Sequence, residues 1–202
     1  MEKFTVVTGI AAPLPQPNVD TDVIIRVERC TRTPKEDMGR YAFEAVRFLP
    51  DGSVNSDFIL NQEPWRAAKI LVCGENFGCG SSREMAVWAI AGIGVRCVIA
   101  PSFGEIFHGN CFQNGLLAIR LDEESVERLA RLAADPATAT FTVDLRRQVI
   151  NADLAFEIDP LHRKALLEGL DAIGLTLARE AEIAAFQAAD RKRRPWVYEL
   201  PA

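Results

Sequence analysis

The sequence predicts an α/β fold, with a mixed sheet in the body of the chain and helices at its C-terminal end. Short apolar strands alternate with helices through the middle of the chain, at residues 69–73, 85–91, 95–100, 106–112 and 116–121. This alternation is typical of βαβ units, in which parallel strands are buried on both faces. Two later segments, 140–150 and 154–158, alternate apolar and polar residues as an antiparallel pair does.

Polar residues mark the expected beginnings of the helices. Ser81 and Ser102 each stand three residues before a glutamate, which is the spacing of a capping box. Asp122 precedes a further helix with one apolar face. Two more helices, at 161–173 and 176–190, close the chain.

The first 40 residues are less regular. A Pro-rich loop at 11–22 leads into a short apolar strand at 23–25, and the polar stretch 26–40 predicts a loop with a turn of helix. From its length of 202 residues, the chain is expected to form a single domain, residues 1–202, with 161–202 as a C-terminal helical element.

Composition and charge exclude several classes of function. The net charge of −5 does not give the basic face that a general nucleic-acid binder needs. The short basic run at 191–194 is interpreted as a solvated helix end. No apolar run approaches the roughly 20 residues that span a bilayer, and the N-terminus lacks a signal-peptide pattern. We therefore expect a cytoplasmic protein with no nucleic-acid or membrane partner.

The cysteines and histidines do not predict a metal site in this chain. The five cysteines stand at irregular spacings without a CxxC pair, and there are two histidines. Most of the cysteines lie in apolar strands and are interpreted as small core residues. His108 and His162 fall in predicted helices and are interpreted as structural.

The segment most informative about chemistry is GENFGCGSSRE, residues 74–84. Its glycines follow a buried strand and let the backbone approach a ligand closely. The amino end of the next helix carries unpaired N–H groups and a partial positive charge. Arg83 adds a planar guanidinium that can bind a carboxylate with two hydrogen bonds. The segment therefore predicts a site for an organic acid.

Two other interpretations of this segment stay open. In the first, Ser81 caps the helix through the capping box that it would form with Glu84. In the second, the segment is a nucleotide-binding loop, although its glycines run G-x3-G-x-G and match neither GxGxxG nor the Walker pattern.

Several blocks of the sequence, in order along nearly the whole chain, resemble the 3-isopropylmalate dehydratase small subunits. They are NVDTD at 18–22, GENFGCGSSRE at 74–84, IAPSFGEIF at 99–107, NCFQNGLL at 110–117 and LEGLDAIGL at 167–175. The resemblance implies the swivelling β/β/α domain that forms the last domain of aconitase. It also implies a hydro-lyase that is active only as a heterodimer or heterotetramer with a large subunit, which would hold a [4Fe–4S] cluster.

The resemblance also implies roles for the loop residues. Ser81 would be the base, acting as an alkoxide, and Ser82 and Arg83 would bind a carboxylate of the hydroxy-acid substrate. The hydroxide would leave to an iron of the partner's cluster. A serine ionises at neutral pH only with help, for which Arg83 and the helix terminus are suited. The positions that would support or orient the loop are Asp20, Thr21, Asp22, Asn76, Gly78 and Gly80. The first three of them are otherwise interpreted as turn formers at the start of a strand.

The sequence departs from the family pattern where the substrate is selected. Met85 stands where the family usually has His, and Arg26 stands where it usually has Pro. Residues 27–37 bear little resemblance to the usual segment, which lies near substrate selection in the family. Three arginines of this loop are therefore candidates for setting specificity, namely Arg26, Arg29 and Arg32.

Three hypotheses of function follow. The first is the interconversion of 2- and 3-isopropylmalate through a dehydrated intermediate, in leucine biosynthesis. The second is a paralogous hydro-lyase that acts on another small acid, such as methylmalate and citraconate, or homoaconitate. The third is a non-catalytic anion-binding module, and only the match of several separated blocks favours the first two over it.

Overall fold

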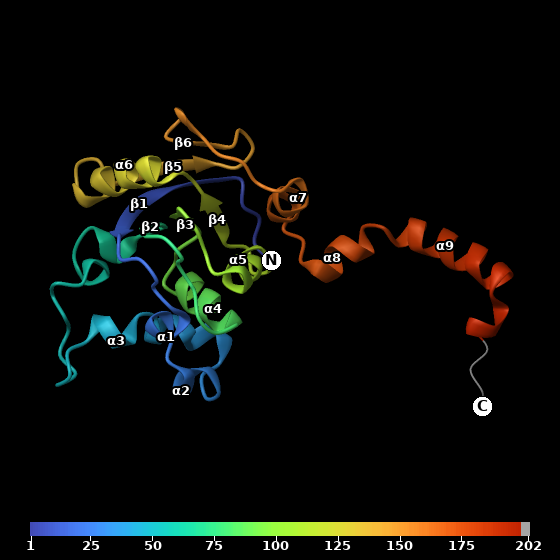
Figure 1. Cartoon of the computed structure of the whole chain (residues 1–202), viewed down its shortest axis with the longest axis horizontal. Helices are drawn as coiled ribbons and strands as arrows, with labels where there is room; N and C mark the ends of the chain where they lie inside the picture. Colours follow the sequence, from blue (N-terminus) through green and yellow to red (C-terminus); the bar gives the residue numbers. More distant parts are fainter. Residues whose placement is uncertain (199–202) are drawn as a thin grey trace.

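The body of the molecule is built on a seven-stranded mixed sheet with strand order β4-β3-β2-β1-β5-β6-β7. The computed structural model describes residues 1–198, and Figure 1 shows the helices arranged around this sheet. The strands are β1 (Val6–Leu14), β2 (Ile70–Cys73), β3 (Cys97–Ala100), β4 (Leu117–Arg120), β5 (Thr140–Asp144), β6 (Val149–Ile150) and β7 (Leu154–Ala155). The mixed α/β class predicted from the sequence is confirmed.

The strand β1 joins two halves of the sheet that differ in direction. Its residues 11–14 pair in parallel with β2, and β3 and β4 continue the parallel half. Its residues 6–10 pair with β5 in antiparallel register, and β6 and β7 continue that half. Every residue of β2 and β3 is buried, which explains why these strands are continuous apolar runs in the sequence.

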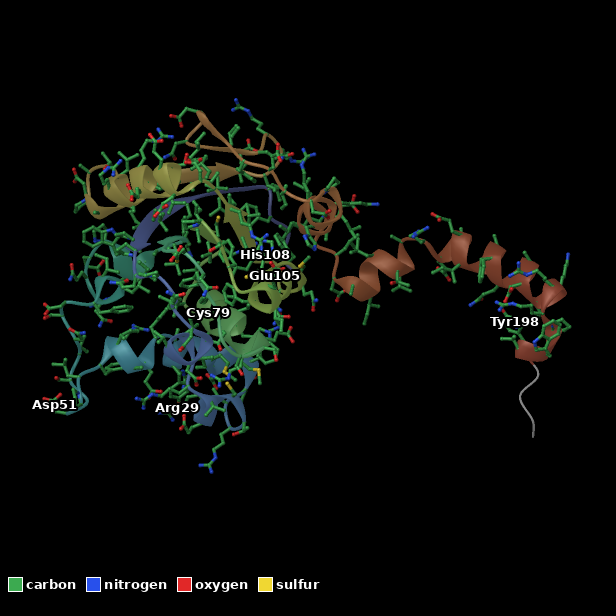
Figure 2. All side chains as sticks on the ribbon, in the orientation of Figure 1. Arg29, Asp51, Cys79, Glu105, His108 and Tyr198 are labelled. Carbon is green, nitrogen blue, oxygen red and sulfur yellow. The ribbon has the colours of Figure 1, made fainter. Side chains whose placement is uncertain are left out.

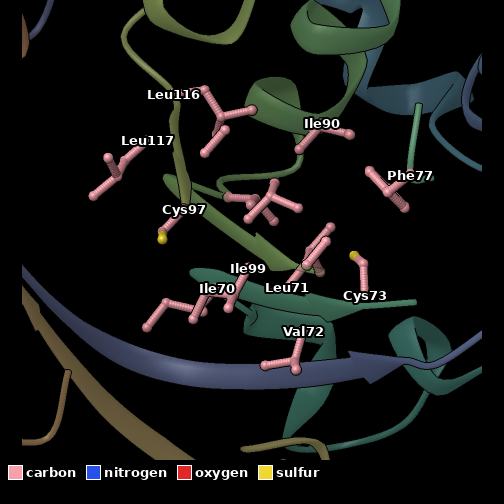
Figure 3. Packing of buried hydrophobic residues seen from close by; sticks show 14 of the residues in the cluster. Ile70, Leu71, Val72, Cys73, Phe77, Ile90, Cys97, Ile99, Leu116 and Leu117 are labelled. Atoms are coloured by element: carbon pink, nitrogen blue, oxygen red, sulfur yellow. The ribbon is translucent and has the colours of Figure 1, made fainter. Parts of the chain in front are cut away.

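Helices cover both faces of the sheet. The helix α6 (Glu123–Ala134) packs on β1 and β2, and α4 (Glu84–Gly92) and α5 (Glu105–Gln113) lie on the opposite face, as Figure 1 shows. Figure 3 shows apolar side chains between α4 and the strands, among them Ile90 and Leu71, which are fully buried. Burial of each such side chain stabilises the fold by about 1.5–3 kcal/mol.

The N-terminal region differs most from the expectation. Residues 11–14 belong to the central strand β1 and not to the predicted Pro-rich loop. The predicted strand at 23–25 is wrong, because Thr21–Ile24 forms the short helix α1. Asp20 caps this helix by accepting a hydrogen bond from Val23 N at 2.8 Å, so it begins a helix and not a strand.

The segment that was expected to be a loop at 26–40 is mostly helical. It contains α2 (Val27–Cys30) and the 3₁₀ helix η1 (Lys35–Tyr41). Three further short helices then lead to β2, namely α3 (Glu44–Arg47), η2 (Ile59–Asn61) and η3 (Trp65–Ala67).

Both predicted capping boxes are wrong. The helix α4 follows Arg83, which makes no side-chain cap, so Ser81 does not cap it. The helix α5 follows Gly104, again without a side-chain cap. The hydroxyl of Ser102 instead accepts a hydrogen bond from Asn76 N at 2.8 Å. In each case, the serine belongs to the loop that precedes the helix. The cap predicted at Asp122 is confirmed, since its Oδ1 accepts from the backbone of α6 at 2.8 Å.

Three helices, and not the predicted two at 161–173 and 176–190, follow the sheet. They are α7 (Pro160–Glu168), α8 (Ala172–Leu177) and α9 (Glu180–Arg193), followed by the 3₁₀ turn η4 (Pro195–Val197). Gly169 ends α7 with a φ of 73°, a left-handed conformation that glycine adopts readily. In Figure 1, α8 and α9 extend away from the sheet as an arm.

The side chains of this arm are almost all exposed. At its end, Arg194 and Arg193 pair with Asp190 at 2.8 and 3.3 Å, and the Arg194 guanidinium lowers the pKa of Asp190 to about 2. The predicted helical element 161–202 includes residues 199–202, which lie outside the described residues. No helix between residues 1 and 198 combines the length and apolar character needed to cross a membrane.

The 3₁₀ helix η1 lies directly against α4. A Cβ at Gly39 would collide with the backbone C and O atoms of Gly92, so the two helices touch backbone to backbone. Met38 is buried beside this contact. The contact holds the end of the 26–40 segment against the helix that follows the glycine-rich loop.

We predict that Gly39→Ala lowers the free energy of unfolding by about 1–3 kcal/mol, because the contact leaves no room for a methyl group. Gly109 in α5 is the matched control, since nothing lies within 4 Å of the position of its Cβ. Gly109→Ala should raise stability by about 0.5–1 kcal/mol. Urea unfolding of the isolated chain measures both changes. An unchanged midpoint for Gly39→Ala would contradict the contact.

Candidate active site

The loop that joins β2 to α4, residues 74–83, is held by main-chain hydrogen bonds on both of its sides. On one side lies the segment that precedes α1. Gly78 N donates to Val19 O at 2.7 Å, and Thr21 N donates to Cys79 O at 3.0 Å. Cys79, labelled in Figure 2, thus takes part in a parallel bridge of the kind that joins strands.

On its other side, the loop pairs with the segment between β3 and α5. Phe77 N donates to Ser102 O at 3.1 Å, and Gly104 N donates back to Phe77 O at 3.0 Å. The hydroxyl of Ser102 accepts from Asn76 N. The part of the loop from Asn76 to Cys79 therefore behaves as a short strand between two others.

Two glycines of the loop lie in the left-handed region of backbone conformation. Gly78 has a φ of 71° and Gly80 a φ of 86°. A Cβ at Gly78 would collide with the ring of Phe107. The sequence predicted that the glycines let the backbone approach a ligand closely. At Gly78, the backbone instead lies close to the side chain of Phe107 in α5. Asn76 also has a positive φ, and its side chain donates to Asn18 Oδ1 at 2.8 Å.

Ser81 and Ser82 follow the strand-like part of the loop and are exposed. The carbonyl of Ser81 accepts two hydrogen bonds, from the hydroxyl of buried Thr21 at 3.2 Å and from Arg83 N at 2.9 Å. These bonds fix the backbone of Ser81. Neither serine hydroxyl has a hydrogen-bond partner among the described residues, so both hydroxyls are free to bind a ligand.

Arg83 is held by Asp22 of α1. Arg83 Nη1 lies 2.5 Å from Asp22 Oδ1, and the side chain of Arg83 is only 16% exposed. The guanidinium beside it lowers the pKa of Asp22, and the carboxylate raises the pKa of Arg83. Nη1 is buried and makes no well-aligned hydrogen bond within residues 1–198, so its contact with Asp22 is a charge pair.

Three of the five cysteines, Cys73, Cys97 and Cys111, are buried in the core. All five are free thiols, and burial raises the pKa of Cys73, Cys97 and Cys111. Metals bind the thiolate, which a raised pKa disfavours. Burial also raises the pKa of Cys30 in α2, where Arg83 opposes the shift. Within the part of the chain that the structure describes, no three His, Cys, Asp or Glu side chains form a group that could hold a metal ion.

Within residues 1–198, none of the three arginines of the 26–37 segment forms an ion pair or hydrogen bond with the serines or with Asp22, the partner of Arg83. Arg29 pairs with Glu44 at 2.5 Å and lies 4.2 Å above the centre of the Tyr41 ring. Arg26 is exposed and lines an open pocket of about 640 Å³ on the outer side of α2 and α3. Arg32 is exposed as well. The other predicted site residues, from Asp20 to Asp22 and from Asn76 to Arg83, do lie together.

The two histidines lie in an aromatic cluster and make no contact with the serines. His108 lies between Phe103 and Phe112, and His162 stacks on Phe112 with ring centres 4.1 Å apart. Burial lowers the pKa of His108 to about 4. Figure 2 labels His108 beside Glu105 of α5.

Sequence reasoning missed Ser102 and Asn18, which both position the glycine-rich loop through Asn76. A signal for Ser102 was present, because it lies two residues after the end of β3, and the carboxyl ends of neighbouring parallel strands meet at one edge of a sheet. Its spacing from Glu105 suggested a helix cap and obscured that signal.

The geometry agrees with comparisons to known proteins. The aconitase C-terminal domain family matches residues 1–124, and the family of the C-terminal domain of the 3-isopropylmalate dehydratase small subunit matches residues 173–199. The 3-isopropylmalate dehydratase of Methanocaldococcus jannaschii, a solved structure, superposes with a TM-score of 0.65 at 26% identity, over 89% of this chain and 98% of that one. The predicted aconitase-type fold is thus confirmed.

Curated relatives carry the same family name. A 3-isopropylmalate dehydratase small subunit of Gluconacetobacter diazotrophicus is 52% identical over 97% of this chain and 97% of its own length. One of Paramagnetospirillum magneticum is 51% identical over 98% of this chain and all of its own length. Identity at this level over nearly the full length of both chains shows the relationship. The chain belongs to the family of 3-isopropylmalate dehydratase small subunits.

Proposed function

We propose that this chain is the small subunit of an enzyme that isomerises 2-isopropylmalate and 3-isopropylmalate by dehydration and rehydration, in leucine biosynthesis. The observation that carries the proposal is the pair of free hydroxyls on Ser81 and Ser82, beside Arg83 and at the amino end of α4. The printed names of the curated relatives support the same reaction.

The proposal includes a large subunit that carries a [4Fe–4S] cluster, in a heterodimer or heterotetramer. Ser81 and Ser82 are exposed, so a second body is needed to exclude water from the reacting substrate. Such a cluster is held by cysteine thiolates, which the buried thiols of this chain do not readily form. The five free cysteines are compatible with a reducing compartment, and we propose the cytoplasm.

Ser81 is the proposed base. Its alkoxide takes the proton from the carbon to be unsaturated, the C–H electron pair becomes the new double bond, and hydroxide leaves from the neighbouring carbon. A cluster in the large subunit would supply the Lewis acid for that departure. In the rehydration, hydroxide adds to the carbon that had lost its proton, and the serine gives its proton to the carbon that had lost hydroxide. Within this chain, Arg83 and the amino end of α4 are the positive charges that favour the alkoxide.

Ser82 and Arg83 are the proposed carboxylate-binding groups. The ion pair with Asp22 holds one side of the guanidinium, and the N–H groups not used there are free to donate to an anion. A charge-assisted pair of hydrogen bonds to a planar carboxylate fixes the orientation of the substrate as well as its position. That orientation is what the base needs, since proton transfer requires the C–H bond to point at Ser81.

Isopropylmalate stays the proposed substrate because the curated relatives are named for it. The charge of Arg29 is matched by Glu44, and Cys30 is the α2 residue whose thiol senses the charge of Arg83. A polarisable thiol suits an alkyl group better than a further carboxylate does.

We predict that Ser81→Ala, assayed with the large subunit, lowers kcat by at least about 10²–10⁴-fold while KM changes little, because a base acts in the transition state. Since Ser81 does not cap α4, the variant should lack the loss of about 1 kcal/mol that removal of a helix cap causes. Ser56→Ala, at an exposed serine far along the chain from the loop, is the control. A variant that keeps its kcat and melts earlier would refute the role as base.

Arg83→Lys should not be conservative. Lysine keeps the charge but loses the planar pair of donors, so we expect kcat/KM to fall by roughly tenfold to a hundredfold. Arg131→Lys, in an exposed ion pair with Glu127 on α6, should leave kcat/KM unchanged. If Arg83→Lys retains most of the activity, the guanidinium is a distant charge and does not clamp the substrate.

We also predict that residues 26–37 set the choice of substrate. Replacing them with the corresponding segment of an isopropylmalate-type relative should change the ratio of kcat/KM between isopropylmalate and a smaller or more acidic analogue, because burial of an alkyl group is worth roughly 0.8 kcal/mol per carbon. Each substrate is assayed with the same large subunit. If the ratio of kcat/KM between the two substrates stays the same, this segment does not set the choice of substrate.

A further inference from the structure

Asn114, the residue that follows α5, joins three parts of the molecule through its side-chain amide. Its Oδ1 accepts from Trp88 Nε1 of α4 at 2.9 Å and from Lys35 Nζ of η1 at 3.1 Å. Its Nδ2 donates to Glu84 Oε1 at 2.8 Å and to Asn110 O at 3.0 Å. The orientation of the amide follows from chemistry, because ammonium and indole groups only donate, and a carboxylate only accepts.

The partners of Asn114 flank the proposed site. Glu84 is the first residue of α4 and directly follows Arg83. Lys35 is the first residue of η1 and directly follows the segment 26–34. Its ammonium also lies 4.8 Å from the centre of the Trp88 ring, which adds a cation–π contact. One amide therefore fixes both the beginning of α4 and the end of the 26–34 segment.

Four hydrogen bonds on one half-buried amide are more than surface packing requires. Two of them involve charged partners, Lys35 and Glu84, and such bonds are about twice as strong as neutral ones. The backbone contact between Gly39 and Gly92 holds the far end of η1 against α4. The Asn114 junction holds the near end, so η1 is attached at both ends.

We propose that Asn114 is a positioning residue for substrate binding: through Glu84 and Lys35 it holds Arg83 and the 26–34 segment in register with each other. This inference rests on the proposed function, since it assigns a purpose to the same site. Asn114 does not touch the substrate, and its effect passes through the backbone on each side of the site.

The test removes the donor from the hydrogen bond between Asn114 and Glu84. Asn114→Asp keeps an oxygen for Lys35 and Trp88 but places a carboxylate against Glu84. Hydrogen exchange of residues 26–41 should rise in the isolated chain, and kcat/KM with the large subunit should fall by roughly tenfold. The loss should lie in KM, because the junction affects how the substrate is held, whereas a loss of folded protein would lower kcat alone.

The double variant Asn114→Asp with Glu84→Gln restores a donor and an acceptor in exchanged positions. It should recover most of the slow exchange and of the KM, since only the bond to Asn110 O is still missing. Asn61→Asp is the matched control, because Asn61 also makes three side-chain hydrogen bonds, to Arg47 and Asn55. It should change neither KM nor exchange in residues 26–41.

Two results would overturn the inference. They are an unchanged KM in Asn114→Asp, whether or not exchange becomes faster, and a double variant that recovers neither property. Failure of the proposed function is distinguished by Ser81→Ala: if that variant keeps its kcat, the assignment of the base is wrong whatever residues 26–41 do in the exchange experiment.

Discussion

The insertion of the glycine-rich loop between two other segments is the constraint on which the rest of the site depends. The bonds of Phe77, Gly78 and Cys79 to both neighbours turn a flexible, glycine-rich stretch into part of the sheet. Buried main-chain groups need partners, and the two neighbouring segments supply them for Phe77 and Gly78. Once the loop is fixed up to Cys79, the next residues have little freedom, and Ser81 and Arg83 reach the surface at defined places.

The ring of Phe107 shows how the constraint is enforced. It occupies the space in which a side chain at residue 78 would lie, and it meets Phe77 edge to face with ring centres 5.5 Å apart. The loop thus packs on α5 through an aromatic pair, which stabilises the contact beyond the area that it buries. Rigidity in the loop is useful because catalytic groups must be held before the substrate arrives.

The sequence predicted the parallel half of the sheet well and the N-terminal region badly, for identifiable reasons. Continuous apolar runs such as 69–73 can be buried only as central strands. By contrast, Val23, Ile24 and Ile25 have high strand propensity but form a helix and its end, because the cap at Asp20 and full burial of both isoleucines outweigh that weak preference. Strand β1 was missed because Gly9 and Pro13 interrupt its apolar pattern.

The residues that make up the site could be predicted from the sequence, but the contacts between them could not. The loop residues themselves follow from glycine chemistry and from the family resemblance. Asp22, the partner of Arg83, lies 61 residues earlier in the chain, and the sequence around it does not predict an ion pair. The spacing at Ser81 suggested a helix cap that does not form, again because of a distant residue: Thr21 holds the carbonyl of Ser81 outside the helix. Long-range partners of this kind are set by the folded backbone.

The central place of β1 also has a consequence for how the protein is made. Of the seven strands, it is the first to leave the ribosome, yet its two neighbours in the sheet begin at Ile70 and Thr140. At typical rates of translation, the antiparallel neighbour follows on the order of ten seconds later. Throughout that interval, at least one hydrogen-bonding edge of β1 stays open, which is the condition under which strands associate with other chains. Vectorial synthesis therefore makes the nascent polypeptide a natural client of chaperones until β5 has emerged.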